Sequence, residues 1–256
     1  MRRVLRPLPA VLLLLALIGI WELYVDLKGQ TFSLILASPH QVAKSLFTDR
    51  SLLWSSFLVT AREVLMGILV ATVIGTAGAV GIHFSPTLRR ATYPLMVASQ
   101  AVPVPVFAPV LAFWLGFGIL PKLVVVAIVS FFSIVVTLTA GLDAVDPDLI
   151  KLMRTFDASR LRTFRHVEFP SALPSLFAGA KIAVAVSVIG AVFAEWTGSN
   201  SGLGYVILVS GPQLLAARGV AATVILSLFA VGLFAGLALL ERFALPWAYR
   251  SAEVPA

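Results

Sequence analysis

The chain has 256 residues, of which 59% are hydrophobic and only 12% are charged. Soluble globular domains carry about 25% charged residues, so this composition excludes an ordinary soluble fold and favours a protein whose surface faces lipid. The net charge of +7 comes from lysines and arginines that lie between long uncharged stretches, which is typical of loops flanking membrane spans and not of a nucleic-acid-binding face.

Six segments are long and apolar enough to cross a bilayer, which takes about 20 residues of helix. The first is 8–27; arginines precede it, as in a signal peptide, but no small-residue cleavage site follows, so an uncleaved span is expected. The others are 62–82, 91–117, 120–141, 175–196 and 220–241. We therefore predict an all-α polytopic membrane protein with about six transmembrane helices, in which residues 1–256 form a single domain.

The lysines and arginines predict the orientation, because cytoplasmic loops are enriched in them. With both termini inside, twelve are cytoplasmic and five are outside, so we expect both termini in the cytoplasm. The cytoplasmic residues are Arg2, Arg3, Arg6, Arg89, Arg90, Lys151, Arg154, Arg160, Arg162, Arg165, Arg242 and Arg250. The outer residues are Lys28, Lys44, Arg50, Lys122 and Arg218.

Prolines interrupt the third predicted span, four of them within residues 94–109. Proline removes a backbone N–H donor, and irregular backbone at membrane depth is tolerated where it is buried in protein or lines a watery cavity. We predict that this segment lines a translocation pathway through Ser99, Gln100, Pro103 and Pro105. The alternative is a kink that only packs against neighbouring spans.

Glu195 lies at the outer end of the fifth span, just before Trp196. Ionisable residues at membrane depth are usually functional or paired, so Glu195 is a further pathway candidate. A solvated carboxylate beside an interfacial tryptophan is the alternative. No pair of carboxylates is expected at membrane depth.

The longest cytoplasmic connection, residues 142–174, has the pattern of two amphipathic helices. Asp143, Asp146, Pro147 and Asp148 are start signals for the first helix. Ser159 is expected to cap the second helix, and Pro170 and Pro174 are expected to end it before the fifth span. From the pattern alone, a hairpin that binds a partner and one that lies on lipid head groups are equally compatible.

The run Leu152-Met-Arg-Thr-Phe-Asp-Ala-Ser159, followed by Phe164-Arg-His-Val-Glu-Phe-Pro170 and Ala172-Leu173-Pro174, resembles the EAA loop of binding-protein-dependent ABC importer permeases. The likeness covers about residues 35–248 and includes three further runs. These are Ala37-Ser38-Pro39, Trp114-Leu-Gly-Phe-Gly-Ile-Leu-Pro-Lys122, and Ala194-Glu195-Trp196 with Gly202-Leu203-Gly204-Tyr205. The chain is most similar to the nitrate/sulfonate/taurine-type subgroup, which includes permeases for thiamine-pyrimidine precursors.

The chain departs from the family pattern at two places in the loop. Lys151, Leu152 and Met153 stand where the family has Glu-Ala-Ala, so the usual charge at the start of the motif is inverted. Asp157 stands where the family has glycine, and aspartate is one of the few other residues that adopt a positive φ at modest cost.

The resemblance implies the permease subunit of an ATP-driven importer in the bacterial inner membrane, for a small nutrient such as a vitamin or pyrimidine precursor or an organosulfonate- or nitrate-like anion. In that family the loop docks in a cleft of a separate cytoplasmic ATPase, a periplasmic or lipid-anchored binding protein delivers the substrate, and two permease copies form a dimer. Coupling to the ATPase is thereby assigned to Asp148, Lys151, Arg154, Thr155, Phe156, Asp157, Ala158, Ser159 and Arg162.

Catalysis is not expected of this chain. No lysine follows a glycine, so the chain has no phosphate-binding loop of its own. Cysteine is absent, no H-E-x-x-H run exists, and His40, His83 and His166 lie in loops or at span ends. We expect no metal, no cofactor and no nucleic-acid partner.

A stand-alone secondary transporter or channel is the alternative function. Such proteins often bury charges for ion coupling, whereas few charges here come near membrane depth, namely Arg62, Glu63, Lys181 and Glu195. The predicted pathway contains almost no fixed positive charge, which favours a neutral or aromatic nutrient.

Overall fold

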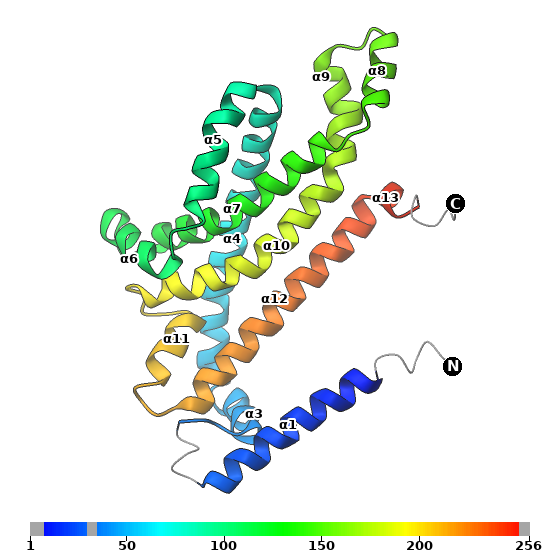
Figure 1. The fold of residues 1–256 in the computed structure, drawn as a ribbon. Helices are drawn as coiled ribbons and strands as arrows, with labels where there is room; N and C mark the ends of the chain where they lie inside the picture. Colours follow the sequence, from blue (N-terminus) through cyan, green and yellow to red (C-terminus); the bar gives the residue numbers. More distant parts are fainter. Residues whose placement is uncertain (1–7, 30–34, 251–256) are drawn as a thin grey trace. The chain divides into compact units, whose positions relative to one another are not determined.

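The computed structural model describes residues 8–29 and 35–250, and within these ranges every regular element is a helix (Figure 1). The all-α prediction is therefore confirmed. The chain separates into two compact units, residues 1–60 with 200–227 and residues 61–199 with 228–256, which are described in turn. Arg2, Arg3 and Arg6, on which part of the expected orientation depends, lie outside the described residues.

Unit 1 contains α1 (Leu8–Lys28), α3 (Pro39–Thr48), α11 (Leu203–Ser210) and the first parts of α4 (Arg50–Phe84) and α12 (Ala216–Ala244). α1 coincides with the first predicted span and contacts α3. A capping box begins α3: the Ser38 hydroxyl accepts from the Gln41 N–H at 3.4 Å, and the Gln41 side chain accepts from the Ser38 N–H at 3.0 Å. The Ala37-Ser38-Pro39 run is thus the start of a helix.

An ion pair joins the end of α3 to α12 within unit 1. Arg218 donates to the Asp49 carboxylate at 2.7 Å. The hydrogen bond from this guanidinium holds the pKa of Asp49 below its usual value. Asp49 also ends α3, since its N–H donates to the Ser45 carbonyl at 2.8 Å.

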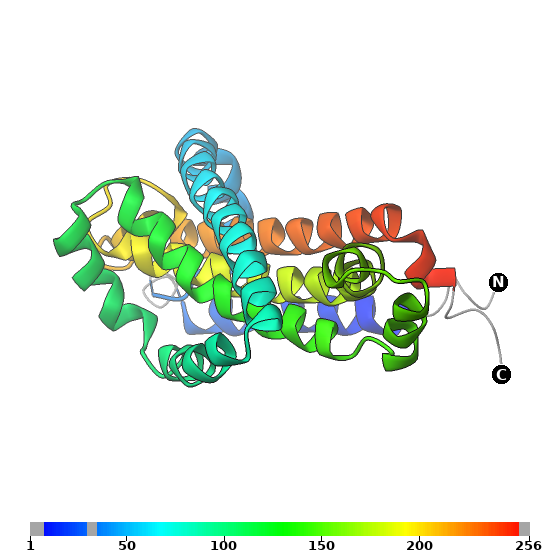
Figure 2. The same ribbon diagram turned by 90° about the horizontal axis from the view of Figure 1, so that it is seen from above.

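Unit 2 is built around α7 (Ile119–Asp143) and α10 (Phe169–Trp196), which pack side by side (Figures 1 and 2). Gly179 of α10 makes the close approach possible, because a Cβ there would lie 2.0 Å from the Thr137 hydroxyl oxygen. The unit also contains α5 (Pro86–Ser99), α6 (Val104–Leu115), α8 (Pro147–Thr155), α9 (Arg160–Thr163) and α13 (Pro246–Arg250), with the remaining parts of α4 and α12.

Among the described residues, four helical stretches are long and apolar enough to cross a membrane: Arg50–Phe84, Ile119–Asp143, Arg160–Trp196 and Ala216–Ala244. Each of them contains one of the predicted spans, namely 62–82, 120–141, 175–196 and 220–241. The polytopic fold class is confirmed, whereas the count of six spans stays a prediction.

The expected continuous helix over 91–117 is corrected by the structure. α5 ends at Ser99 and α6 begins at Val104, so the chain is not helical at 101–103. Pro103 has an extended backbone (φ −66°, ψ 128°) and precedes α6. The residue before a proline is disfavoured in the α conformation, and Pro103 and Pro105 both lack the N–H that a continuous helix would need.

The expected helix end at Pro170 and Pro174 is also wrong. Helical backbone runs without interruption from Arg160 to Trp196, through a π-helical turn at Phe164–Glu168. In this wider turn the Phe169 N–H donates to the Phe164 carbonyl, five residues back. The π turn widens the backbone just before Pro170, where a regular α-turn would bring the ring against the preceding turn.

Candidate functional site

The first arm of the predicted coupling loop is α8, which begins where the sequence signals place it. The Asp146 carboxylate accepts from the Asp148 N–H at 2.8 Å, and Pro147 occupies the first turn, where its missing N–H costs nothing. Lys151 donates to Asp148 at 2.7 Å along the exposed helix surface. These contacts are all local, which is why the start of α8 could be predicted.

α8 ends in a left-handed turn, which is the conformation implied by the glycine of the family pattern. Asp157 has a φ of 53°, its N–H donates to the Arg154 carbonyl at 3.0 Å, and the Ala158 N–H donates to the Met153 carbonyl at 3.1 Å. These two bonds form a Schellman motif. Aspartate therefore takes the conformation for which the family pattern uses glycine.

The second arm begins at Ser159, whose hydroxyl accepts from the Arg162 N–H at 3.4 Å, as predicted. This arm is fixed to the end of α4. The Phe164 ring lies 5.0 Å from that of Phe84, and Arg160 lies over the same Phe84 ring at 5.0 Å. Beneath them, His83 and the buried Glu168 are hydrogen bonded at 2.9 Å.

The hairpin presents an apolar face to its surroundings. Within Pro147–Thr155 no residue is buried, and α8 extends beyond the ends of α7 and α10 (Figure 1). Leu152 and Phe156 are 51% and 72% exposed, and Leu161 on the second arm is 68% exposed. A nine-residue helix with no packed face is marginal in water, so this surface needs a partner.

The structure brings the predicted coupling residues together on this hairpin, where Ala158 is half-buried and the others are exposed. Their part in coupling stays a prediction. The exposed set is Asp148, Lys151, Arg154, Thr155, Phe156, Asp157, Ser159 and Arg162.

The predicted pathway residues lie at the break between α5 and α6. Ser99 ends α5, and Gln100 caps it and is exposed. Gln100 lines a cavity of about 180 Å³ together with Phe107 of α6 and residues of α7 and α10. Pro103 and Pro105 are exposed beside this opening, so the break faces a cavity as well as packing against other helices.

Glu195 is not a solvated interfacial carboxylate, because it is completely buried. It adjoins the carboxyl group of Glu63, which is itself 2% exposed, so the expectation of no carboxylate pair at membrane depth is wrong. Lys122 donates to Glu63 at 2.7 Å and to Ser199 at 2.8 Å. This buried network ties α4 and α7 to the end of α10 and the turn after it.

Two of the sequence runs that carried the resemblance meet at this network. The Phe117 ring, in the turn between α6 and α7, covers Gly198, where a Cβ would lie 2.3 Å from the ring. Gly198 has a φ of 76° and its neighbour Ser199 binds Lys122. The sequence analysis assigned Lys122 to an outer loop; its position next to Pro121, between uncharged stretches, was the available signal.

A second ion pair missed from the sequence joins Lys181 of α10 to Glu241 of α12. Both side chains are mostly buried. Lys181 lies within the predicted fifth span, where an ionisable residue is expected to be paired.

Comparison with known proteins identifies transport permeases by family model and by sequence identity. The family model described as "Binding-protein-dependent transport system inner membrane component" matches residues 63–244. The chain is 35% identical to a "Probable ABC transporter permease protein" of Haemophilus influenzae, over 94% of this chain and 97% of that protein. It is 34% identical to the formylaminopyrimidine transport permease protein ThiX of Halalkalibacterium halodurans, over 96% of this chain and 98% of that protein.

The fold is similar to a solved structure titled "Crystal structure of an amino acid ABC transporter with histidines". The TM-score is 0.62 with 14% sequence identity, and the match covers 79% of this chain and 96% of that chain. At this identity the likeness shows a shared fold.

Proposed function

Because the chain belongs to the family of binding-protein-dependent transport system inner membrane components, we propose that its hairpin 146–168 transmits ATP-driven closure of a separate cytoplasmic subunit to the membrane helices. The chain is the permease subunit of an ABC importer, of the nitrate/sulfonate/taurine-type subgroup that includes pyrimidine-precursor permeases. It is a multi-pass component of the inner membrane, and the family is a transport family and not an enzyme family.

The observation that carries the proposal is the exposed apolar face of α8, on a hairpin that leads without interruption into α10. A partner cleft that covers Leu149, Leu152 and Phe156 removes this apolar surface from water. Because helical backbone is continuous from Arg160 to Trp196, a displacement of the hairpin moves α10 with it.

The charge of the hairpin defines the partner cleft further. Lys151 and Arg154 are exposed on α8, and Lys151 stands where the family pattern has an acidic residue. The matching ATPase therefore presents carboxylates to this helix. In the usual family pattern the helix carries the acidic residue, so the charges on the two sides of the contact are exchanged here. ATP hydrolysis resides on that partner.

The translocation path is proposed to pass the α5–α6 break, with Gln100 as its polar contact. The cavity that Gln100 lines is otherwise apolar, which suits a small neutral heteroaromatic nutrient better than an anion. ThiX, a relative of near-equal length, is named for formylaminopyrimidine transport. A pyrimidine precursor is therefore the proposed substrate class, ahead of organosulfonates and nitrate.

The assembly is proposed to contain two copies of this chain and two ATPases, with a periplasmic or lipid-anchored binding protein outside. Both termini then lie in the cytoplasm, on the same side as the hairpin, in keeping with the excess of lysine and arginine there.

Co-purification with the ATPase, followed by transport in vesicles, tests the coupling proposal. Arg154→Glu and Phe156→Ala should each reduce ATPase recovery and uptake together. Arg242→Glu, an exposed arginine in the last turn of α12, is the matched control and should change neither. Normal uptake in both hairpin variants would remove the hairpin from the mechanism. Uptake by the chain alone without ATP would establish a secondary transporter instead.

Pro103→Ala separates the pathway from the kink interpretation. As a pathway residue, Pro103 should affect uptake while ATPase recovery stays normal. Equal loss of uptake and ATPase recovery would show that the proline only supports packing.

A further inference from the structure

The buried network that ties α4 to the ends of α7 and α10 contains two carboxyl groups but one ammonium group. The carboxyl groups belong to Glu63 and Glu195, which are 2% and 0% exposed, and the ammonium group belongs to Lys122. If both carboxyl groups were ionised, the network would carry one net negative charge. Burial of an uncompensated charge costs more than protonation of the group that carries it, so one positive charge is missing from this count.

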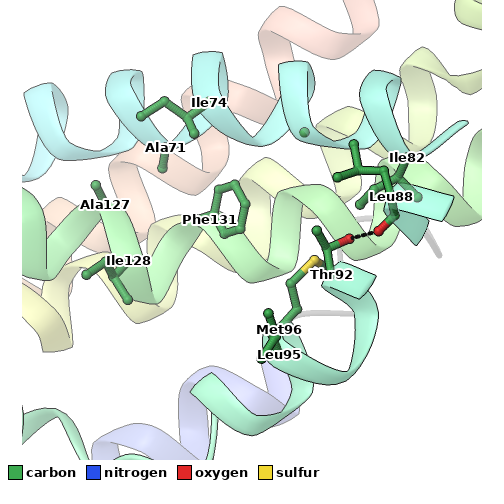
Figure 3. Close-up of a pocket in the computed structure, with 11 residues that line it drawn as sticks. Ala71, Ile74, Ile82, Leu88, Thr92, Leu95, Met96, Ala127, Ile128 and Phe131 are labelled. Carbon is green, nitrogen blue, oxygen red and sulfur yellow. Dashed lines mark hydrogen bonds between the residues drawn. The ribbon is translucent and has the colours of Figure 1, made fainter. Parts of the chain in front are cut away.

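The three helices offer no further charge to the network. The other charged or titratable side chains of α4, α7 and α10, helices that the structure describes throughout, are exposed or already paired. Arg50 and Arg62 are exposed, and the paired groups are His83 with Glu168, Asp143 with Arg89 and Lys181 with Glu241. Further along α4, Ala71 and Ile74 line an apolar groove together with Phe131 of α7 (Figure 3).

One oxygen of the network lacks a hydrogen-bond donor. Lys122 donates to Oε1 of Glu63 at 2.7 Å, whereas Oε2 of Glu63 is buried and receives no hydrogen bond from the described residues. The carboxyl group of Glu195 is the neighbour of this carboxylate. A carboxylate only accepts hydrogen bonds, but a protonated carboxyl group also donates one. A proton between the two carboxyl groups therefore supplies both the missing donor and the missing charge.

A water molecule or a metal ion fits this place less well. One turn beyond Glu63, α4 and α7 are so close that a Cβ at Gly67 would lie 2.4 Å from a methyl group of Val126. The cavity beside Lys122 measures about 10 Å³ and neither carboxyl group lines it, whereas a water molecule needs about 10–15 Å³ and would leave the charge uncompensated. Within 8–29 and 35–250 no three metal-ligating side chains come together, and the ammonium group repels a second cation.

We propose that Glu63 and Glu195 bind one proton between them at neutral pH, which makes the network with Lys122 electrically neutral. Two carboxyl groups that share a buried site do not both ionise, and the proton belongs to the pair and not to either residue. The network is thus a proton-binding clamp at the ends of α7 and α10 that lie away from the hairpin (Figure 1). It holds α4 against them without leaving a net charge in apolar surroundings.

Infrared spectroscopy of the purified protein at neutral pH detects the proton. A protonated carboxylic acid and a carboxylate have separate C=O stretching bands, so the difference between wild type and Glu195→Gln should show the loss of one protonated acid and no loss of carboxylate. Glu63→Gln should give the same result from the other side of the pair. Glu241→Gln is the matched control: Lys181 and Glu241 form a mostly buried pair with one carboxylate for one ammonium group, so this variant should lose a carboxylate.

Thermal unfolding tests the charge count independently. Glu195→Gln replaces the shared proton by an amide N–H and leaves one carboxylate for Lys122, so its Tm should stay close to that of wild type. Glu241→Gln leaves Lys181 without its counter-charge and should lower the Tm by roughly 10 °C. The double variant Glu63→Gln/Glu195→Gln removes both carboxylates from Lys122 and should show a similar fall.

Three results would overturn the proposal. The first is the loss of a carboxylate band in Glu195→Gln, which would show that both groups are ionised in the wild type. The second is a fall in the Tm of Glu195→Gln as large as that of Glu241→Gln. The third is failure of both Glu195→Gln and Glu63→Gln to fold, because each retains one carboxylate for one ammonium group and should therefore be tolerated.

Discussion

Replacing Lys122 by methionine should lower the free energy of unfolding by about 3–5 kcal/mol, the usual cost of breaking a buried ion pair by removing one partner. Lys122 and Glu63 lie 2.7 Å apart, and their side chains are 12% and 3% exposed. Methionine keeps most of the apolar volume of lysine, so the change mainly removes charge. It leaves Glu63 without its ammonium partner and beside the Glu195 carboxyl group.

The chain contains a matched control at the same distance. Lys151 and Asp148 are also 2.7 Å apart, but their side chains are 72% and 80% exposed. Exposed ion pairs contribute less than about 1 kcal/mol, so Lys151→Met should have little effect on stability. The two pairs have the same distance between nitrogen and oxygen, so the comparison mainly reports the difference in burial.

Unfolding in mixed detergent micelles, followed by tryptophan fluorescence, gives the free energies. A double-mutant cycle with Glu63→Gln should show a coupling of at least about 2 kcal/mol, because the neutral amide no longer needs the ammonium group. If Lys122→Met costs no more than Lys151→Met, or if Glu63→Gln fails to rescue it, the assignment of Lys122 as the compensating charge is refuted.

Three further outcomes are expected. Asp157→Val should destabilise the hairpin by about 1–2 kcal/mol, because a β-branched residue resists a φ of 53°, whereas Asp157→Gly should be tolerated; proteolysis of the hairpin distinguishes them. Folding lowers the pKa of Asp49, so the Asp49–Arg218 pair stabilises the folded protein fully above about pH 4 and loses this effect as the pH falls through the pKa of Asp49 in the folded state. Thermal unfolding measured from pH 6 to 3 should show this loss of stability in acid, and Asp49→Asn should remove the pH dependence. Gly179→Ala should destabilise the α7–α10 contact, where its Cβ would meet an oxygen at 2.0 Å, while Gly232→Ala should be neutral in the same unfolding assay.

The hairpin shows how far local sequence carries a prediction. Its helix starts at Asp146 and Ser159 and the left-handed turn at Asp157 depend on bonds between residues two to five positions apart. The sequence predicted a helix start within 143–148 and one at Ser159, and the family pattern implied the turn. The helix end at Pro170 was not, because the π turn that accommodates this proline is stabilised by packing of Phe164 and Glu168 against α4. A proline is a local stop signal, but contacts from another helix can override it.

The amino-acid sequence by itself determined the membrane class, the positions of the long apolar helices, the hairpin and its family, because each depends on composition, periodicity or a contiguous motif. Only the tertiary structure decided that Glu63, Lys122 and Ser199 form one buried network, since 59 and 77 residues separate Lys122 from its two partners. Whether a charged side chain at a span end meets water or another charge depends on which helices lie next to it, and no local pattern contains that information.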